Sequence, residues 1–222
     1  MTTLERPPAA LFCLTCGPQA VLERDPAAPL LRCASCDAVT EVPALPLFVL
    51  TGASGTGKTT VTVPLRRLLP QCEVFEGDPI NQIAALGWGL FYDTWLRIAH
   101  EVALNGRPTV LCTSMMPDRL ERLPARKLLG PVYFGNLDCP DDILAARLRA
   151  RPAWRHASTE EAIANHQRFA AWLRAHIAPT WDTSTMTPGE TAARIAAWVR
   201  PLLGPVVTPT PDDGSLGGPW PS

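Results

Sequence analysis

The sequence predicts an α/β protein in which helices cover both faces of a parallel sheet, with a small cysteine-rich module in front. Three observations lead to this fold class. Apolar strand-like runs alternate with helical segments from Leu47 onward, a pattern typical of parallel sheets. A glycine-rich segment, G-A-S-G-T-G-K-T at 52–59, joins the first run to the first helix. Two C-x-x-C pairs, at 13–16 and 33–36, precede the sheet.

Length and charge limit what the chain can be. Its 222 residues suffice for one sizeable α/β core and a small appendage. A formal net charge of −1 produces no overall field toward nucleic acid or acidic membranes. No apolar run approaches the ~20 residues of a membrane span, and residues 1–8 lack the features of a secretory signal. We therefore expect a cytoplasmic protein whose cysteines are metal ligands or buried thiols rather than disulfides.

The spacing of a four-thiolate zinc site is present in Cys13, Cys16, Cys33 and Cys36, whose two pairs are separated by 16 residues. Each pair directs two sulfurs to one side, and two pairs complete a tetrahedron around Zn²⁺. So small a module buries too little apolar surface to fold alone, so the metal would stabilise it. We expect a structural zinc ribbon at residues 1–44; redox pairs or unrelated thiols are the alternatives.

The glycine-rich segment matches G-x-x-x-x-G-K-[ST], a loop that holds nucleotide phosphates. Its glycines let the backbone curl, so that successive N–H groups point into one concavity. Lys58 adds charge for the β and γ phosphates, and the Thr59 hydroxyl is suited to Mg²⁺. A strand at 45–51 and a helix from 60 onward place the loop at a helix N-terminus, where phosphate binds. The residues expected to bind ATP are Gly52, Ser54, Gly55, Thr56, Gly57, Lys58, Thr59 and Thr60.

The other elements follow along the chain. Strands are expected at 72–79, 107–114, 131–137 and 181–184, and ribbon strands at 19–24 and 30–32. Helices are expected at 80–105, 118–129, 141–148, 158–177 and 187–203. Ser158 with Glu161 resembles a capping box. Residues 45–203 therefore form the α/β domain, and the Pro- and Gly-rich residues 204–222 are expected to be a disordered tail.

An arginine-rich segment at 147–155 follows the fourth strand and its helix. Arginine binds phosphate oxygens bidentately and stays charged, so this segment suits a lid over a triphosphate. Arg147 and Arg151 share one helical face by their spacing. A solvated helix face that ends at Pro152 is the alternative.

These features make residues 47–203 similar to the small phosphate-loop kinases, which include nucleoside, nucleotide, gluconate and shikimate kinases. The resemblance rests on the loop, on the acidic Glu76 and Asp78, on the hydroxyl residues 113–114 at the end of the third strand, and on the arginine-rich segment. It implies a three-layer P-loop NTPase sandwich with a five-stranded parallel sheet in order 2-3-1-4-5. It also implies in-line transfer of the ATP γ-phosphoryl group to a hydroxyl or phosphate acceptor.

Several residues have a role in this chemistry. Lys58, Arg147 and Arg151 would bind the phosphates that transfer or leave. Asp78, at the ligand-binding edge of the sheet, would orient and deprotonate an acceptor hydroxyl, or else begin a helix before Pro79. Glu76 is a second candidate for this carboxylate role.

Further side chains have two interpretations each. Trp88, Tyr92 and Trp95 either stack on the acceptor or form a buried stripe of a helix, which the spacing favours. Arg119 and Arg122 either contact the acceptor or lie on a solvated helix face, which we favour. The four histidines have no metal-binding spacing and are expected at the surface.

We therefore expect a kinase that uses ATP, Mg²⁺ and a structural Zn²⁺, with a small-molecule acceptor that is most simply a nucleoside or nucleotide. A zinc-ribbon nucleic-acid-binding ATPase or polynucleotide 5′-kinase is the alternative, and a nucleotide-binding regulator without turnover is a third possibility. The near-neutral charge and the lack of a basic stripe speak against nucleic acid. We expect no membrane partner.

Overall fold

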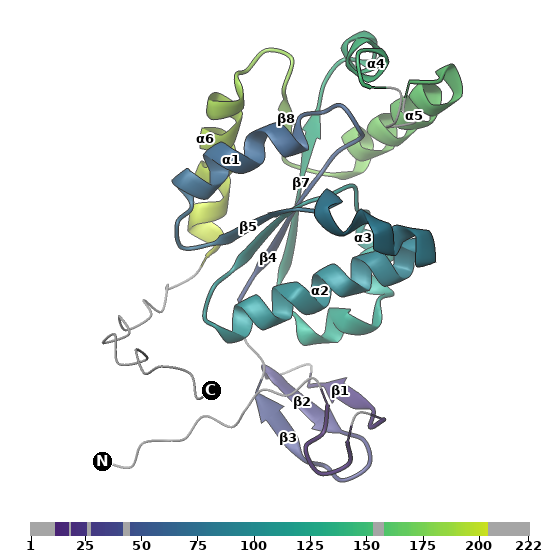
Figure 1. Cartoon of the computed structure of the whole chain (residues 1–222). Coiled ribbons are helices and arrows are strands. Elements are labelled where there is room, and N and C mark those ends of the chain that lie inside the picture. The colour runs from purple at the N-terminus through teal and green to yellow at the C-terminus, as the bar shows by residue number, and fades with distance from the viewer. Residues whose placement is uncertain (1–11, 18, 26–27, 42–44, 153–157, 204–222) are drawn as a thin grey trace, which may run out of the picture.

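A computed structural model describes residues 12–17, 19–25, 28–41, 45–152 and 158–203 (Figure 1). Its larger part is a five-stranded parallel sheet between helices, and a three-stranded antiparallel sheet lies at one end. The predicted α/β class, with a small module before it, is confirmed. The expected tail at 204–222 and residues 153–157, which include the end of the arginine-rich segment, lie outside the described residues.

The large sheet has the predicted strand order. Its strands are β4 (Leu47–Thr51), β5 (Glu73–Glu76), β6 (Thr109–Cys112), β7 (Val132–Asp138) and β8 (Thr180–Asp182). Their order in the sheet is β5-β6-β4-β7-β8, which is 2-3-1-4-5 when counted along the chain from β4. Every residue of the central strand β4 is buried, as in strands covered on both faces. The carboxyl ends of these parallel strands share one edge, where ligands bind in such sheets.

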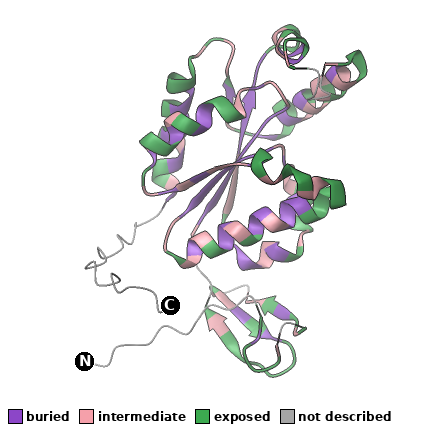
Figure 2. Ribbon diagram, in the orientation of Figure 1, coloured by how far each residue is buried: buried purple, intermediate pink, exposed green. Residues whose placement is uncertain are grey.

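Alternate residues of β4 face two different hydrophobic clusters. Phe48 and Leu50 pack with α1 (Lys58–Leu68) and α6 (Pro188–Val199) on one face of the sheet. Leu47 and Val49 pack with α2 (Trp88–Leu104) and the 3₁₀ segment η2 (Pro124–Leu128) on the other face. Figure 2 shows that buried residues fill the sheet and the inward sides of these helices. The period-2 pattern of the strand thus divides the core in two.

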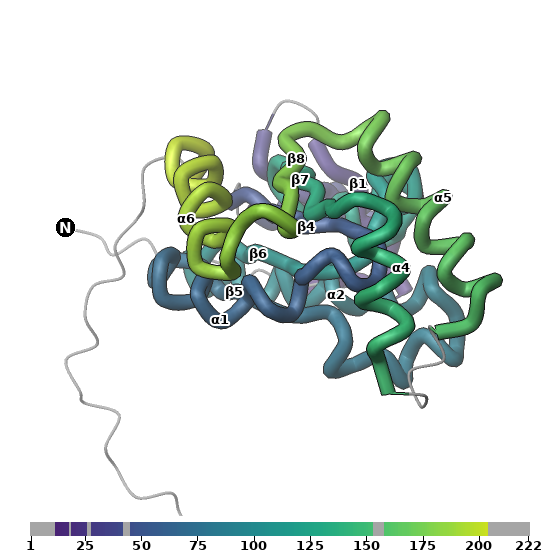
Figure 3. The backbone as a smooth tube through the Cα atoms, turned by 90° about the horizontal axis from the view of Figure 1, so that it is seen from above, coloured from purple at the N-terminus to yellow at the C-terminus, as the bar shows by residue number. Residues whose placement is uncertain are grey.

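Two further helices stand at the carboxyl end of the sheet. They are α4 (Asp141–Arg149) and α5 (Glu160–His176), which lie beside each other (Figure 3). Helix α5 begins one residue later than the predicted capping box, because Thr159 accepts the hydrogen bond from the Ala162 N–H. No helix in the described ranges is both long and apolar enough to cross a bilayer.

Two predicted helices are each divided in the structure. The first becomes η1 (Asp78–Leu86) and α2, because Gly87 takes a φ of 127° that a helix does not allow. The second becomes α3 (Pro117–Glu121) and η2. Pro124 causes this break, since the residue before a proline is driven out of the helical region, and Leu123 is extended. The chain ends its described part in η4 (Arg200–Leu202).

The ribbon has one strand more than predicted. Its strands are β1 (Leu22–Arg24), β2 (Leu30–Cys33) and β3 (Val39–Glu41), and the third was too short to be recognised as a strand from its sequence. Leu22 and Leu31 are buried in the same cluster as Leu128 of η2. The ribbon therefore packs against the α/β part through apolar side chains.

The contact between β7 and β8 requires a glycine. A Cβ atom on Gly135 would lie 2.6 Å from Cζ3 of Trp181, whose ring is buried. We expect Gly135→Ala to lower the free energy of unfolding by about 1–3 kcal/mol, because overpacking displaces the indole. Urea denaturation measures this change.

The matched control is Gly89→Ala in α2, where an added Cβ meets no atom within 4 Å. Helix propensity predicts that this variant is unchanged or more stable by up to ~1 kcal/mol. Equal stabilities of the two variants would contradict the packing of Trp181 against β7.

Candidate functional site

The glycine-rich segment forms a tight loop at the carboxyl end of β4. Gly55 and Gly57 have φ values of 95° and 92°, which favour glycine, and Gly57 is the N-cap of α1. The buried Thr56 hydroxyl donates to the Ala53 carbonyl at 2.9 Å and closes the loop. A Cβ on Gly52 would lie 2.6 Å from the Leu137 carbonyl oxygen. The backbone thus presents the start of a helix to an anion.

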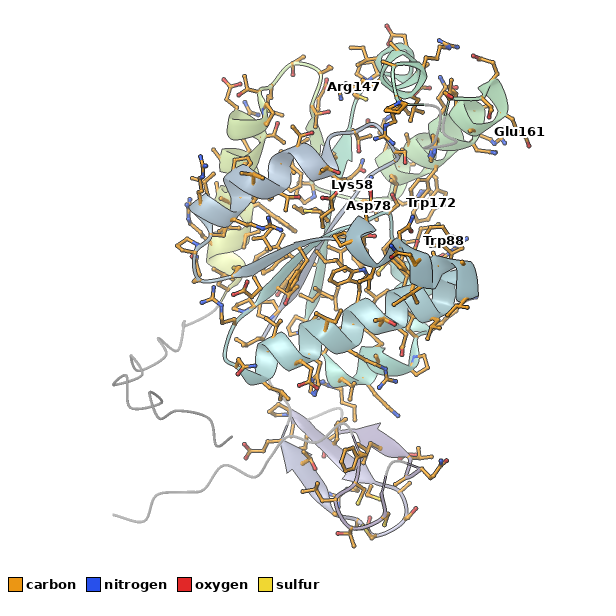
Figure 4. All side chains as sticks on the ribbon, viewed as in Figure 1. Lys58, Asp78, Trp88, Arg147, Glu161 and Trp172 are labelled. Carbon is orange, nitrogen blue, oxygen red and sulfur yellow. The ribbon has the colours of Figure 1, made fainter. Side chains whose placement is uncertain are left out.

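The partly buried side chain of Lys58 folds back over this loop. Its Nζ donates to the carbonyl oxygens of Gly52 at 2.6 Å and of Ala53 at 2.9 Å. Burial lowers the pKa of Lys58 to about 8, Asp78 opposes this shift, and Arg151 adds to it. Figure 4 shows Lys58 and Asp78 near each other at the centre of the molecule. At neutral pH, below this pKa, Lys58 is therefore mostly an ammonium group.

Two carboxylates lie at the carboxyl end of β5, Glu76 as its last residue and Asp78 just after it. The Thr59 hydroxyl donates to the Glu76 carboxylate, so the two predicted polar groups are in direct contact. Hydroxyl and carboxylate oxygens are the ligands that Mg²⁺ prefers, and this pair is suited to hold it. Asp78 is exposed and lies in the first turn of η1, with Gly77 rather than Asp78 as the N-cap. Its side chain is therefore not the helix cap that was the alternative to a functional role.

Both predicted arginines lie at the loop. Arg147 donates to the Gly55 carbonyl at 3.2 Å, and to the hydroxyl and carbonyl of Thr183 at 2.9 Å each. It therefore holds the phosphate loop to the segment after β8. Arg151 follows α4 and also lines the site.

Two adjoining cavities open at this edge of the sheet. The smaller, of about 170 Å³, surrounds the phosphate loop. The larger, of about 810 Å³, extends toward α2 and α5 and is called the acceptor cavity below. The two share four lining residues, Ser54, Asp78, Ser114 and Arg151. A ligand in the acceptor cavity would therefore meet one in the phosphate loop at Asp78 and Arg151.

The three predicted aromatic residues of α2 lie in two different environments. Trp88, which is 53% exposed, and the buried Tyr92 line the acceptor cavity, with ring centroids 5.8 Å apart. The Tyr92 hydroxyl donates to the Ser114 carbonyl at 2.5 Å. Trp95 belongs to the core, where its Nε1 donates to the Gly77 carbonyl at 3.3 Å. Two rings thus face the cavity, and the third supports the turn that carries Asp78.

Some cavity residues were not predicted. These are His166 and Phe169, which reach the acceptor cavity from α5. Arg119, for which acceptor contact was the less favoured of two interpretations, lines the cavity from α3. Burial lowers the pKa of His166, and Lys58 and Arg151 lower it further. The spacing of His166 and Phe169 by three residues puts them on one helix face. That spacing alone does not indicate which face of α5 looks into the site.

The surface location expected for the histidines is wrong for His100, which is 1% exposed. Its Nδ1 lies 2.9 Å from the Leu128 carbonyl, and burial lowers its pKa. In the unfolded chain the pKa of His100 is near 6.5, so as the pH falls the unfolded chain binds a proton at His100 before the folded protein does. His100 should therefore not reduce the free energy of unfolding above about pH 6.5. Below it, the free energy of unfolding should fall by up to about 1.4 kcal/mol per pH unit as the pH drops toward the lowered pKa of His100 in the folded protein.

Urea denaturation at several pH values measures this slope. His100→Gln should have a shallower slope below about pH 6.5, whereas substitution of the exposed His176 by Gln should leave it as in the wild type. Identical slopes in all three proteins would contradict a neutral buried His100.

The four predicted cysteines converge in the ribbon. Their Sγ atoms all lie within 4.8 Å of one another, and those of Cys13 and Cys36 are 3.6 Å apart. A tetrahedral zinc–thiolate site has sulfur–sulfur separations of about 3.8 Å. The backbone N–H of Cys16 lowers the pKa of Cys13 to about 6, while a hydrogen bond to Cys36 raises the pKa of Cys16 to about 12. By their separations, the four sulfurs are close enough to share one cation.

Comparisons with known proteins concern the fold. No protein-family model and no curated protein matches the chain. A sugar kinase from Janibacter sp. HTCC2649, without ligand, matches with a TM-score of 0.54 and 20% identity, covering 76% of this chain and all of that one. The tunicamycin resistance protein of Deinococcus radiodurans matches with a TM-score of 0.52 and 22% identity, over 70% of this chain and 95% of that one.

Shikimate kinase from Acinetobacter baumannii, in complex with shikimate, has a TM-score of 0.51 and 20% identity, over 72% of this chain and 96% of that one. These likenesses confirm the predicted resemblance in fold to the small phosphate-loop kinases.

Proposed function

We propose that the protein is an ATP- and Mg²⁺-dependent phosphotransferase that moves the γ-phosphoryl group to a small-molecule acceptor. The observation that carries this proposal is the meeting of two cavities at Ser54, Asp78, Ser114 and Arg151. Phosphoryl transfer depends on positioning and charge neutralisation more than on covalent chemistry. A phosphate loop that opens onto a separate, larger cavity with a carboxylate at the junction meets both needs.

Each residue has a defined task in this reaction. The loop N–H groups bind phosphate oxygens, and the Lys58 ammonium exchanges the Gly52 and Ala53 carbonyls for them. Asp78 accepts a hydrogen bond from the acceptor hydroxyl and takes its proton as the new O–P bond forms and the bond to ADP breaks. Arg151 neutralises charge on the transferring group. Thr59 and Glu76 would hold Mg²⁺, which supplies further charge neutralisation when bound.

A nucleoside or nucleotide is the acceptor that this cavity suits best. Trp88 and Tyr92 offer aromatic faces for a base, and Arg119 and Arg151 offer charge for a phosphate. The volume of about 810 Å³ fits a ligand of this size. A nucleic-acid strand is disfavoured because the net charge of the chain is −1.

The test is ADP release from ATP·Mg²⁺ in the presence of nucleosides, nucleotides, sugars, sugar acids, aminoglycosides and an oligonucleotide. Nucleosides or nucleotides should give the largest kcat/KM. Equal background rates with every acceptor would overturn the kinase proposal. Stimulation by the oligonucleotide alone would favour the nucleic-acid-dependent ATPase or polynucleotide 5′-kinase instead.

We also propose that the ribbon cysteines hold Zn²⁺, so gently purified protein should contain about one zinc per chain. Cys33→Ser should lose the metal and lower the melting temperature, because four thiolates share one ion. Cys72→Ala, a buried thiol outside the cluster, should keep the zinc. Elemental analysis of the three proteins decides this, and metal-free wild-type protein would refute the zinc site.

A further inference from the structure

An arginine of the ribbon bonds to the α/β part. Arg24, at the end of β1, donates through Nη1 to the carbonyls of Lys127 at 3.1 Å and Leu129 at 2.7 Å. These carbonyls lie at the end of η2, more than a hundred residues further along the chain. Leu22 and Leu31 of the ribbon pack in the same cluster as Leu128 and Leu129. A charged donor with two carbonyl acceptors and an apolar contact fix η2 against the ribbon.

The segment η2 in turn supports the helices that line the acceptor cavity. The backbone N–H of Ala125 donates to the Asp93 carboxylate of α2 at 2.7 Å. His100 of α2 contacts the Leu128 carbonyl at 2.9 Å. An ion pair of 2.8 Å joins Arg126 of η2 to Glu121 of α3. Both helices adjacent to η2 are therefore held by it.

These two helices carry one side of the acceptor cavity, which we call the acceptor wall: Trp88 and Tyr92 of α2, and Arg119 of α3. The phosphate-loop side of the site is supported by other hydrophobic clusters. The clusters beneath α1 and α6, and between α4 and α5, contain no ribbon residue among the described positions. The ribbon is thus connected to the acceptor wall and separate from the phosphate loop (Figure 4).

We propose that Arg24 is a positioning residue for the acceptor: it fixes η2, and η2 fixes the acceptor wall. The kinetic part of this inference rests on the proposed phosphotransferase function. The ribbon then acts as a brace for one substrate and not for the other. Loss of the Arg24 contacts weakens acceptor binding and leaves nucleotide binding intact.

Steady-state kinetics of Arg24→Ala test this brace. The KM for the acceptor should rise about tenfold, which corresponds to the loss of one or two charged hydrogen bonds. The KM for ATP and kcat at saturating acceptor should change by less than about twofold. Arg24→Lys keeps one charged donor and should recover part of the loss. A general loss of structure would instead lower kcat, or raise both KM values together.

The matched control is Arg32→Ala. Arg32 belongs to the same ribbon and carries the same charge, but its partner is Asp37 of the ribbon itself, at 4.0 Å. This variant should have the kinetic constants of the wild type. An equal rise in acceptor KM in Arg24→Ala and Arg32→Ala, or none in either, would overturn the inference.

A second measurement does not depend on activity. Hydrogen exchange of Arg24→Ala should accelerate in α3 and η2 and stay unchanged in the phosphate loop and α1. Binding of a non-hydrolysable ATP analogue should also stay unchanged. If no acceptor is phosphorylated by the wild type, the proposed function fails. Hydrogen exchange alone then tests whether Arg24 fixes η2 and the acceptor wall. Unchanged protection of α3 and η2 would overturn it.

Discussion

Replacement of Lys58 by alanine is expected to lower kcat/KM for phosphoryl transfer by about 10³-fold. The Lys58 ammonium is the cation that lies within the phosphate loop, where it already bonds to the Gly52 and Ala53 carbonyls. Without it, the charge that develops on the β and γ phosphates has no fixed counter-charge inside the loop. Steady-state ADP release at about pH 7, below the lowered pKa of about 8, measures the effect.

Lys127→Ala is the control, because the chain has one other lysine and its side chain lies in η2, away from both cavities. It should retain wild-type kcat/KM. Circular dichroism and melting temperature confirm that both variants are folded. Retention of more than about a tenth of the rate by Lys58→Ala would refute the assignment of the loop as a catalytic phosphate site.

Substitution of Asp78 by asparagine should lower kcat by about 10²- to 10³-fold while ATP binding persists. Asparagine has the same shape and accepts a hydrogen bond, but it does not take a proton from the acceptor. Asp78 lies in both cavities, so its loss affects the transfer step more than either binding step. Single-turnover kinetics measure transfer, and titration with a non-hydrolysable ATP analogue measures binding.

Asp142→Asn, at an exposed position in the first turn of α4, is the matched control and should behave as the wild type. An Asp78→Asn variant with normal kcat would exclude Asp78 as the base. Glu76, the last residue of β5, which contacts Thr59, would then be examined by Glu76→Gln.

The parts of this molecule that are predictable from sequence are those encoded by short-range patterns. The loop from Gly52 to Thr59 combines glycines at fixed spacing with a following helix, and both are local properties. The two C-x-x-C pairs are predictable for the same reason, since each pair forms its own local turn and only the number of residues between the pairs varies. The strand order followed from the resemblance rather than from the strands themselves.

Features that depend on distant parts of the chain were not accessible in this way. The contact of Arg24 with Lys127 and Leu129 joins segments that no local pattern connects. His166 has no sequence signal, because the direction of its helix face is set by the packing of α5 at the end of the sheet. The helix breaks at Gly87 because this residue has a positive φ, and a glycine inside an apolar run does not by itself indicate a positive φ.

The division of the core by β4 has an evolutionary consequence. The acceptor wall packs on the cluster beneath α2 and η2, whereas α1 packs on the cluster of the opposite face. Mutations can therefore accumulate on one face without disturbing the packing of the other. Libraries randomised only at α2 and α3 should yield changed substrate preference at constant nucleotide affinity, which makes this scaffold suited to diversification of its specificity.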